Sequence, residues 1–127
     1  MFYEDKDILL RQIKQVAYLI ARMLFGKESP RYDLAVREGT QWRLADLLHD
    51  RLAELLAAGR LDEAENELFV RLNREDRHVL EVALDFYDQL NELSDQQLAT
   101  GGFSREEVEQ GLADVLAFYG VRIPGLL

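Results

Sequence analysis

Apolar residues recur at helical intervals from the start of the chain. Between residues 5 and 25 one stripe keeps spacings of three and four: Leu9, Ile13, Val16, Ile20 and Leu24. These spacings match the 3.6-residue period of an α-helix. They predict a long first helix that ends near Gly26, because glycine commonly follows the last helical turn.

The same periodicity predicts four further helices, with expected bounds of 42–58, 61–73, 75–93 and 104–119. Ser104 with Glu107 forms a capping-box pattern that marks the start of the last helix, and Phe103 can pack on Val108 as a hydrophobic staple. Nearly half the circumference of 75–93 is apolar, so this helix should be central.

The segments between these helices predict turns and one connector. Ser94 can cap a short turn that runs to Leu98. Residues 27–40 contain Ser29-Pro30 and Gly39, and we expect a connector with one or two helical turns.

The fold class expected from this pattern is all-α. No segment alternates strictly between apolar and polar residues, and 8 Gly and 2 Pro are too few for a protein built on many tight turns. The 127 residues suit one domain, spanning 1–127. We expect a compact bundle of about five helices without a sheet, in which the second and third helices form an antiparallel hairpin.

This hairpin resembles the turn of a tetratricopeptide repeat. Residues 55–64 read LLAAGRLDEA, followed by Leu68 and Phe69. By this resemblance Gly59 serves the turn and Ala64 the close crossing of the two helices. No second copy follows 34 residues later, so the pattern indicates one hairpin and not an array.

The opening of the chain carries a second resemblance. Residues 2–13 read FYEDKDILLRQI, which resembles the start of a family of small all-helical bacterial proteins of uncharacterised function. Members of that family continue with tetratricopeptide-like hairpins. The resemblance implies the same helical fold and supplies no catalytic or binding residues.

Charge is unevenly distributed along the chain. The formal net charge is -9, residues 1–27 carry +2, and residues 61–127 carry -10 from five basic and fifteen acidic side chains. Without a cluster of Lys and Arg, nucleic-acid binding is not expected, and the negative charge disfavours anionic membranes. The asymmetry is compatible with a homodimer.

Composition also bounds location and chemistry. Cysteine is absent, so disulfides and thiolate metal sites are excluded. Glu4, Asp5 and Asp7 precede the first apolar run, and charged residues interrupt every longer one. Neither a secretory signal nor a membrane span is expected, which favours a cytoplasmic protein.

Two carboxylate–imidazole pairs are the strongest candidates for metal chemistry. Asp46 lies three residues before His49, and Glu75 three before His78. Paired helices can bind metals in this way, provided that further carboxylates point inward. The inward rows of every predicted helix read as apolar, so we expect these residues and the other acids at the surface or at helix ends.

The function expected from these features is a non-catalytic, cytoplasmic helical interaction module. No phosphate-binding loop, nucleophile elbow or zinc-protease motif occurs, so we expect neither an enzyme nor a cofactor. A protein partner of unspecified identity, or a second copy, would contact Phe2, Tyr3, Tyr32 or Trp42, aromatic residues that can mark interfaces. The alternative is a metal- or small-ligand-binding bundle.

Overall fold

The structure is a computed structural model in which residues 2–34 and 43–122 are described, with only the backbone considered for 2–6. Six helices make up the described chain: α1 (Phe2–Phe25), α2 (Leu44–Ala57), α3 (Leu61–Arg71), α4 (Arg77–Glu92), α5 (Asp95–Thr100) and α6 (Arg105–Phe118). No strand occurs in these ranges, which confirms the all-α prediction. None of the described helices has the length and apolarity needed to cross a membrane.

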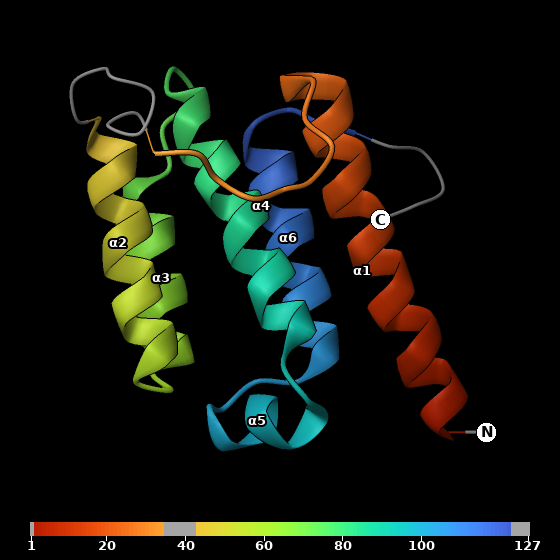
Figure 1. Cartoon of the computed structure of the whole chain (residues 1–127). Helices are drawn as coiled ribbons and strands as arrows, with labels where there is room; N and C mark the ends of the chain where they lie inside the picture. Colours follow the sequence, from red (N-terminus) through yellow and green to blue (C-terminus); the bar gives the residue numbers. More distant parts are fainter. Residues whose placement is uncertain (1, 35–42, 123–127) are drawn as a thin grey trace.

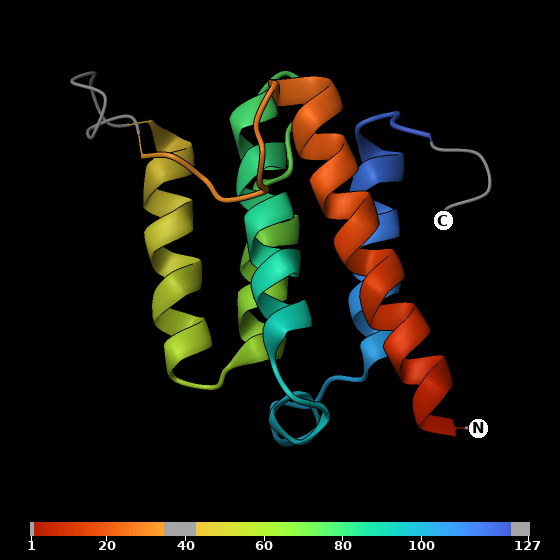
Figure 2. The same ribbon diagram turned by 45° about the vertical axis from the view of Figure 1, so that its right-hand side comes forward.

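Helix α4 lies at the centre of the bundle, as its wide apolar arc predicts. It packs against α1, α2 and α6, and α1 also packs against α6 (Figures 1 and 2). Helices α2 and α3 form an antiparallel hairpin beside this group, while the short α5 crosses one end of the bundle. Gly59 has a φ of 74° in the turn between α2 and α3, a conformation that favours glycine.

The helix bounds follow the predicted capping residues closely. Ser104 Oγ accepts a hydrogen bond from the backbone N of Glu107 at 3.2 Å, which confirms the capping box of α6. Phe103 and Val108, the expected staple, are both buried. The turn after Ser94 is a full short helix, α5, because Ser94 and Gln97 form a second capping box. This sixth helix accounts for the difference from the expected count of about five.

One prediction about the interior is wrong. The inward rows were expected to be entirely apolar, yet Asp46, Asp85, Asn91 and Arg105 are buried among the hydrophobic side chains. A buried polar group is tolerated when hydrogen bonds replace its lost hydration, and a helical-period pattern carries no information about such partners.

Arg105 illustrates how a buried charge is accommodated in this fold. Its guanidinium donates to the backbone oxygens of Asn91 at 2.6 Å and Leu93 at 3.0 Å, where α4 ends. It also donates to the Asp95 carboxylate at 2.9 Å, at the start of α5. The side chain therefore supplies donors to carbonyls that a helix C-terminus leaves unpaired, and joins α4, α5 and α6.

Helices α3, α4 and α6 meet at a buried tyrosine. The Tyr87 hydroxyl donates to Glu65 Oε2 at 2.6 Å, and Gly111 of α6 faces this pair. A methyl group at Gly111 would lie 2.4 Å from Glu65 Oε2 and 2.5 Å from the Tyr87 hydroxyl oxygen. Burial and the adjacent Glu65 carboxylate raise the pKa of Tyr87. Glycine at position 111 is therefore required by the close approach of the three helices.

We predict that Gly111→Ala destabilises the fold by about 1 kcal/mol, because overpacking at Tyr87 exceeds the gain in helix propensity. Urea unfolding followed by circular dichroism measures the change. The matched control is Ala117→Gly at an exposed position of the same helix, where loss of propensity should itself cost up to about 1 kcal/mol. A Gly111→Ala protein as stable as the wild type would contradict the predicted clash.

Candidate functional site

Residues 26–34 form a strap that leaves the end of α1 and crosses over α4 toward α2 (Figures 1 and 2). Residues 27–34 contain no helix; the remainder of the expected connector lies outside the described residues. Lys27 stabilises the strap: its ammonium group donates to the backbone oxygen of Arg31 and lies 3.4 Å from an Asp33 carboxylate oxygen and 3.5 Å from Glu81 Oε2.

Asp85, on the face of α4 beneath the strap, joins three segments of the chain. It is 5% exposed, and Oδ2 accepts a hydrogen bond from the backbone N of Tyr32 at 2.7 Å. Its second oxygen accepts from the Gln89 amide, and His49 Nε2 of α2 lies 3.4 Å from Oδ2. Burial alone would raise the pKa of Asp85, but His49, Tyr32 and Gln89 together lower it below its usual value.

Tyr32 extends this network to the start of α2. Its side chain is 2% exposed, and its hydroxyl donates to Asp46 Oδ1 at 2.6 Å. The other Asp46 oxygen accepts from the backbone N of Arg43 at 2.8 Å, where it caps the helix. The Tyr32 ring stacks on His49 with 5.2 Å between ring centroids. Burial and the Asp46 carboxylate raise the pKa of Tyr32.

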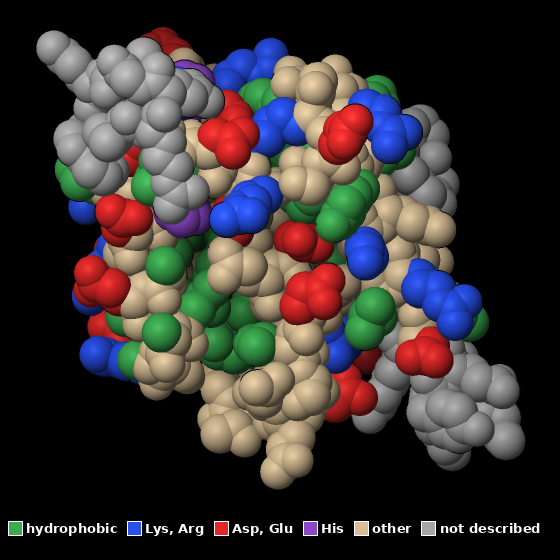
Figure 3. Space-filling model, in the orientation of Figure 1, with side chains coloured by type: hydrophobic (Ala, Val, Ile, Leu, Met, Phe, Trp, Pro, Cys, Tyr) green, Lys and Arg blue, Asp and Glu red, His purple; other side chains and the backbone are tan. Residues whose placement is uncertain are grey.

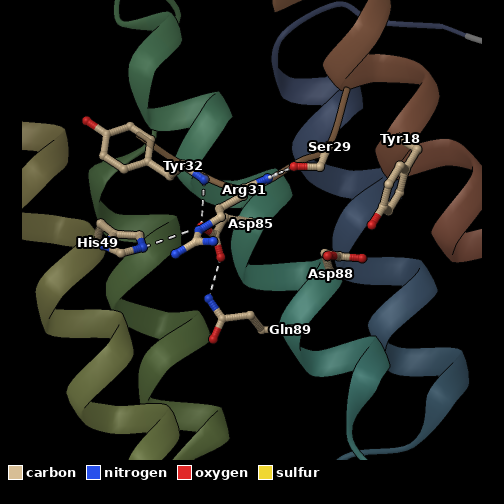
Figure 4. Close-up of a pocket in the computed structure, with 8 residues that line it drawn as sticks. All are labelled: Tyr18, Ser29, Arg31, Tyr32, His49, Asp85, Asp88 and Gln89. Atoms are coloured by element: carbon tan, nitrogen blue, oxygen red, sulfur yellow. Dashed lines mark hydrogen bonds and ion pairs between the residues drawn. The ribbon is translucent and has the colours of Figure 1, made fainter. Parts of the chain in front are cut away.

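A polar cavity of about 420 Å³ opens between the strap, α1, α2 and α4. Figure 4 shows the residues that line it: Tyr18, Ser29, Arg31, Tyr32, His49, Asp85, Asp88 and Gln89. Tyr18 and Asp88 lie on the side toward α1, with the tyrosine oxygen directed toward the carboxylate, and His49 lies on the side toward α2. Volumes of this order are typical of small-molecule sites.

Two polar atoms at this site are buried and make no hydrogen bond. They are Asp88 Oδ1 and His49 Nδ1, although the latter lies 3.6 Å from an Asp50 carboxylate oxygen. Burial, together with the Glu92 and Asp85 carboxylates, raises the pKa of Asp88 to about 6 against an opposing effect of Lys14. An ionised Asp88 at neutral pH therefore lacks compensation for part of its lost hydration.

The same network favours the cationic form of His49. The interaction with Asp85 raises the pKa of His49, outweighing the opposing effect of burial, and Asp50 contributes in the same direction. Arg31, on the strap, is exposed, and its guanidinium makes no ion pair with any residue in the described part of the chain. The cavity thus presents cationic and anionic groups that can bind the charged parts of a ligand.

The four candidate metal ligands do not converge. Asp46 is buried beneath Tyr32, and His49 contacts Asp85. Glu75 precedes α4 and is exposed, while His78 Nδ1 lies 3.0 Å from Glu81 Oε1 and 3.1 Å from an Arg43 nitrogen. Across residues 2–34 and 43–122, no three His, Cys, Asp or Glu side chains form a group that could hold a metal ion.

The aromatic residues expected at an interaction surface are only partly described. Phe2 and Tyr3 belong to α1, but their side chains are outside the description, and Trp42 lies outside the described residues. Tyr32 is an interior residue, because its ring and hydroxyl are engaged by His49 and Asp46. It therefore contributes a cavity wall rather than an exposed aromatic contact.

Sequence reasoning missed Asp85, Asp88 and Arg31 as site residues. One available signal was the stretch 79–87, VLEVALDFY, where a carboxylate stands among apolar residues on all sides of a helix. A helix that is apolar around its circumference is buried, and an acid within it is buried too. No comparable sequence pattern marks Arg31 or Asp88 as a site residue, because the strap and α4 approach each other only in the folded chain.

We predict that Asp88→Asn stabilises the protein by about 1 kcal/mol at pH 7.5 and by well under half of that at pH 4.5. The raised pKa of Asp88 contributes stability that is fully present below its ordinary value of 3.8 and is lost as the pH rises through about 6. Urea unfolding at both pH values measures the difference. Asp62→Asn, at an exposed site on α3, is the control, and an equal effect of Asp88→Asn at both pH values would refute the prediction.

The comparisons with known proteins place the chain in a family without an assigned activity. Residues 3–120 match a family of unknown function, DUF6483. This match includes the helices that build the cavity and confirms the resemblance of the opening residues to a small all-helical family of uncharacterised function. No curated protein and no solved structure matches the chain significantly. Nearly the whole chain therefore belongs to the family of unknown function DUF6483.

Proposed function

We propose that this protein is a non-catalytic helical binding domain, and that the cavity beneath the strap takes a small charged molecule. The observation that carries the proposal is Asp88, which lines the cavity (Figure 4) and whose buried Oδ1 has no hydrogen-bond partner. Unpaired buried polar atoms are uncommon in native proteins, and a ligand donor at this position would compensate the lost hydration.

The construction of the cavity supports binding more than catalysis. His49 is the residue best suited to general base chemistry, but its ion pair with Asp85 favours the cationic form, which cannot accept a proton. Asp85 in turn already accepts from Tyr32 and Gln89. These residues act by supporting the cavity wall, while Asp88, Arg31 and Tyr18 have capacity left for a ligand.

A cavity-filling variant tests the proposal. Ser29→Phe places a ring in the cavity, and Glu28→Phe is the control on the same strap, since Glu28 is exposed and does not line the cavity. The wild-type protein and both variants are heated with a panel of charged, zwitterionic and neutral compounds of fewer than fifteen heavy atoms.

We expect at least one compound to raise the Tm of the wild type and of Glu28→Phe by several degrees. Saturation at a hundredfold excess over Kd stabilises the folded state by about 2.7 kcal/mol. The same compound should leave Ser29→Phe unchanged. If no compound raises Tm, or if Ser29→Phe responds like the wild type, the cavity is not the binding site.

A second candidate function is protein interaction through one end of the α2–α3 hairpin. Four large apolar side chains are exposed there: Leu44 at 71%, Leu47 at 58%, Phe69 at 37% and Val70 at 78%. The antiparallel arrangement puts the start of α2 and the end of α3 at the same end of the hairpin. Exposed apolar residues at one end of a hairpin are typical of interaction surfaces, and we propose a second copy of the chain as the partner.

We predict that the wild type forms a dimer whose dissociation constant rises about tenfold or more in the double variant Leu44→Gln, Leu47→Gln. Light scattering after size-exclusion chromatography, over a concentration series, measures the mass. Met23→Gln is the control, since Met23 is 64% exposed on α1. A wild-type protein that stays monomeric at every concentration would exclude the homodimer.

A further inference from the structure

We propose that the ligand of the strap cavity is a small zwitterion, with its cationic group against Asp88 and its anionic group against Arg31. This inference rests on the proposed function, because it names the chemical class that the same cavity binds. It follows from the charged side chains that line the cavity. Some of them already have a partner of opposite charge among the described residues, and others do not.

The α1 side of the cavity is suited to a cation. Asp88 Oδ1 is buried without a hydrogen-bond partner, and the Asp85 and Glu92 carboxylates add negative potential at Asp88. The nearby cation is Lys14, but its ammonium lies 5.6 Å from the centroid of the Tyr18 ring and does not form an ion pair with Asp88 within the described residues. An ammonium group on a ligand would therefore pair with a carboxylate that lacks a close positive partner.

The strap side is suited to an anion. Two basic side chains, Arg31 and His49, line the cavity, and His49 already contacts the Asp85 carboxylate. Arg31 is different, because its backbone is held by Ser29 and Lys27 while its guanidinium makes no ion pair with the part of the chain that the structure describes. The planar guanidinium can donate two parallel hydrogen bonds to a carboxylate. Because the backbone of Arg31 is anchored, the guanidinium can take only a limited range of positions at the cavity.

The two unpaired charges lie at the same cavity without neutralising each other. A purely anionic ligand would meet Asp85 and Asp88, and a purely cationic ligand would meet Arg31 and His49. Like charges at close range in a partly buried site oppose binding. A molecule with both signs avoids either conflict, and a cavity of about 420 Å³ limits it to a small compound.

Matched compounds of one chain length test the charge requirement. γ-Aminobutyrate carries both groups, n-butylamine only the cation and butyrate only the anion; glycine, β-alanine and 6-aminohexanoate vary the distance between the charges. Isothermal titration calorimetry at pH 7.5 measures Kd for each with the wild type. We expect one zwitterion in the series to bind at least tenfold more tightly than the amine and the acid.

Two variants then assign the groups. Arg31→Gln should weaken zwitterion binding at least tenfold without weakening binding of the amine, whereas Asp88→Asn should weaken zwitterion binding similarly without weakening binding of the acid. Arg71→Gln and Asp62→Asn, both at exposed positions on α3, are the matched controls and should not change Kd. Circular dichroism verifies that each variant is folded.

The outcomes separate this inference from the proposed function. If a singly charged or neutral compound binds as tightly as the zwitterions and Ser29→Phe abolishes its binding, the cavity is a binding site but the ligand class is wrong. If zwitterion binding survives both Arg31→Gln and Asp88→Asn, the assignment of the two groups is also wrong. If neither these compounds nor the wider panel bind, the proposed function fails and the ligand class fails with it.

Discussion

A buried carboxylate at Asp85 is the constraint on which the site depends. A charge removed from water is stable only when donors replace its hydration, and these donors come from the strap, α2 and α4. The hydrogen bonds and the ion pair of Asp85 therefore hold together the strap, α2 and α4, which are distant from one another in the sequence. The Tyr32–Asp46 hydrogen bond extends the same requirement to the start of α2.

The cavity is a consequence of this arrangement. Because Tyr32 is drawn inward by two acceptors, the strap lies across α4 and encloses space against α1. The face that carries the strap has acidic and basic side chains interspersed, with hydrophobic side chains visible between them (Figure 3). Mixed charge of this kind is suited to a small polar ligand and contrasts with the single-sign surface that polyanion binding requires.

The parts of this structure that could be predicted from sequence are local. Ser104 and Glu107 cap α6 from positions three residues apart, and Gly59 lies in a turn between two adjacent helices. In both cases the interacting residues are close together in the sequence, so a short stretch of sequence is enough to predict the structure. The site depends on contacts between distant segments: Asp85 and Tyr32 are 53 residues apart. Periodicity identified the buried face of α4, but it treats every inward position alike and could not reveal which polar residues find partners.

The hairpin of α2 and α3 is joined to the rest of the bundle by both apolar and polar contacts. Besides apolar packing between α2 and α4, its links include His49 to Asp85, Asp46 to Tyr32 and Glu65 to Tyr87, which all involve ionisable side chains. Groups of helices can open as units before the whole protein unfolds. We infer that protonation of these carboxylates weakens the attachment of the hairpin. Acidification should therefore speed amide hydrogen exchange in α2 and α3 beyond the change in the chemical exchange rate.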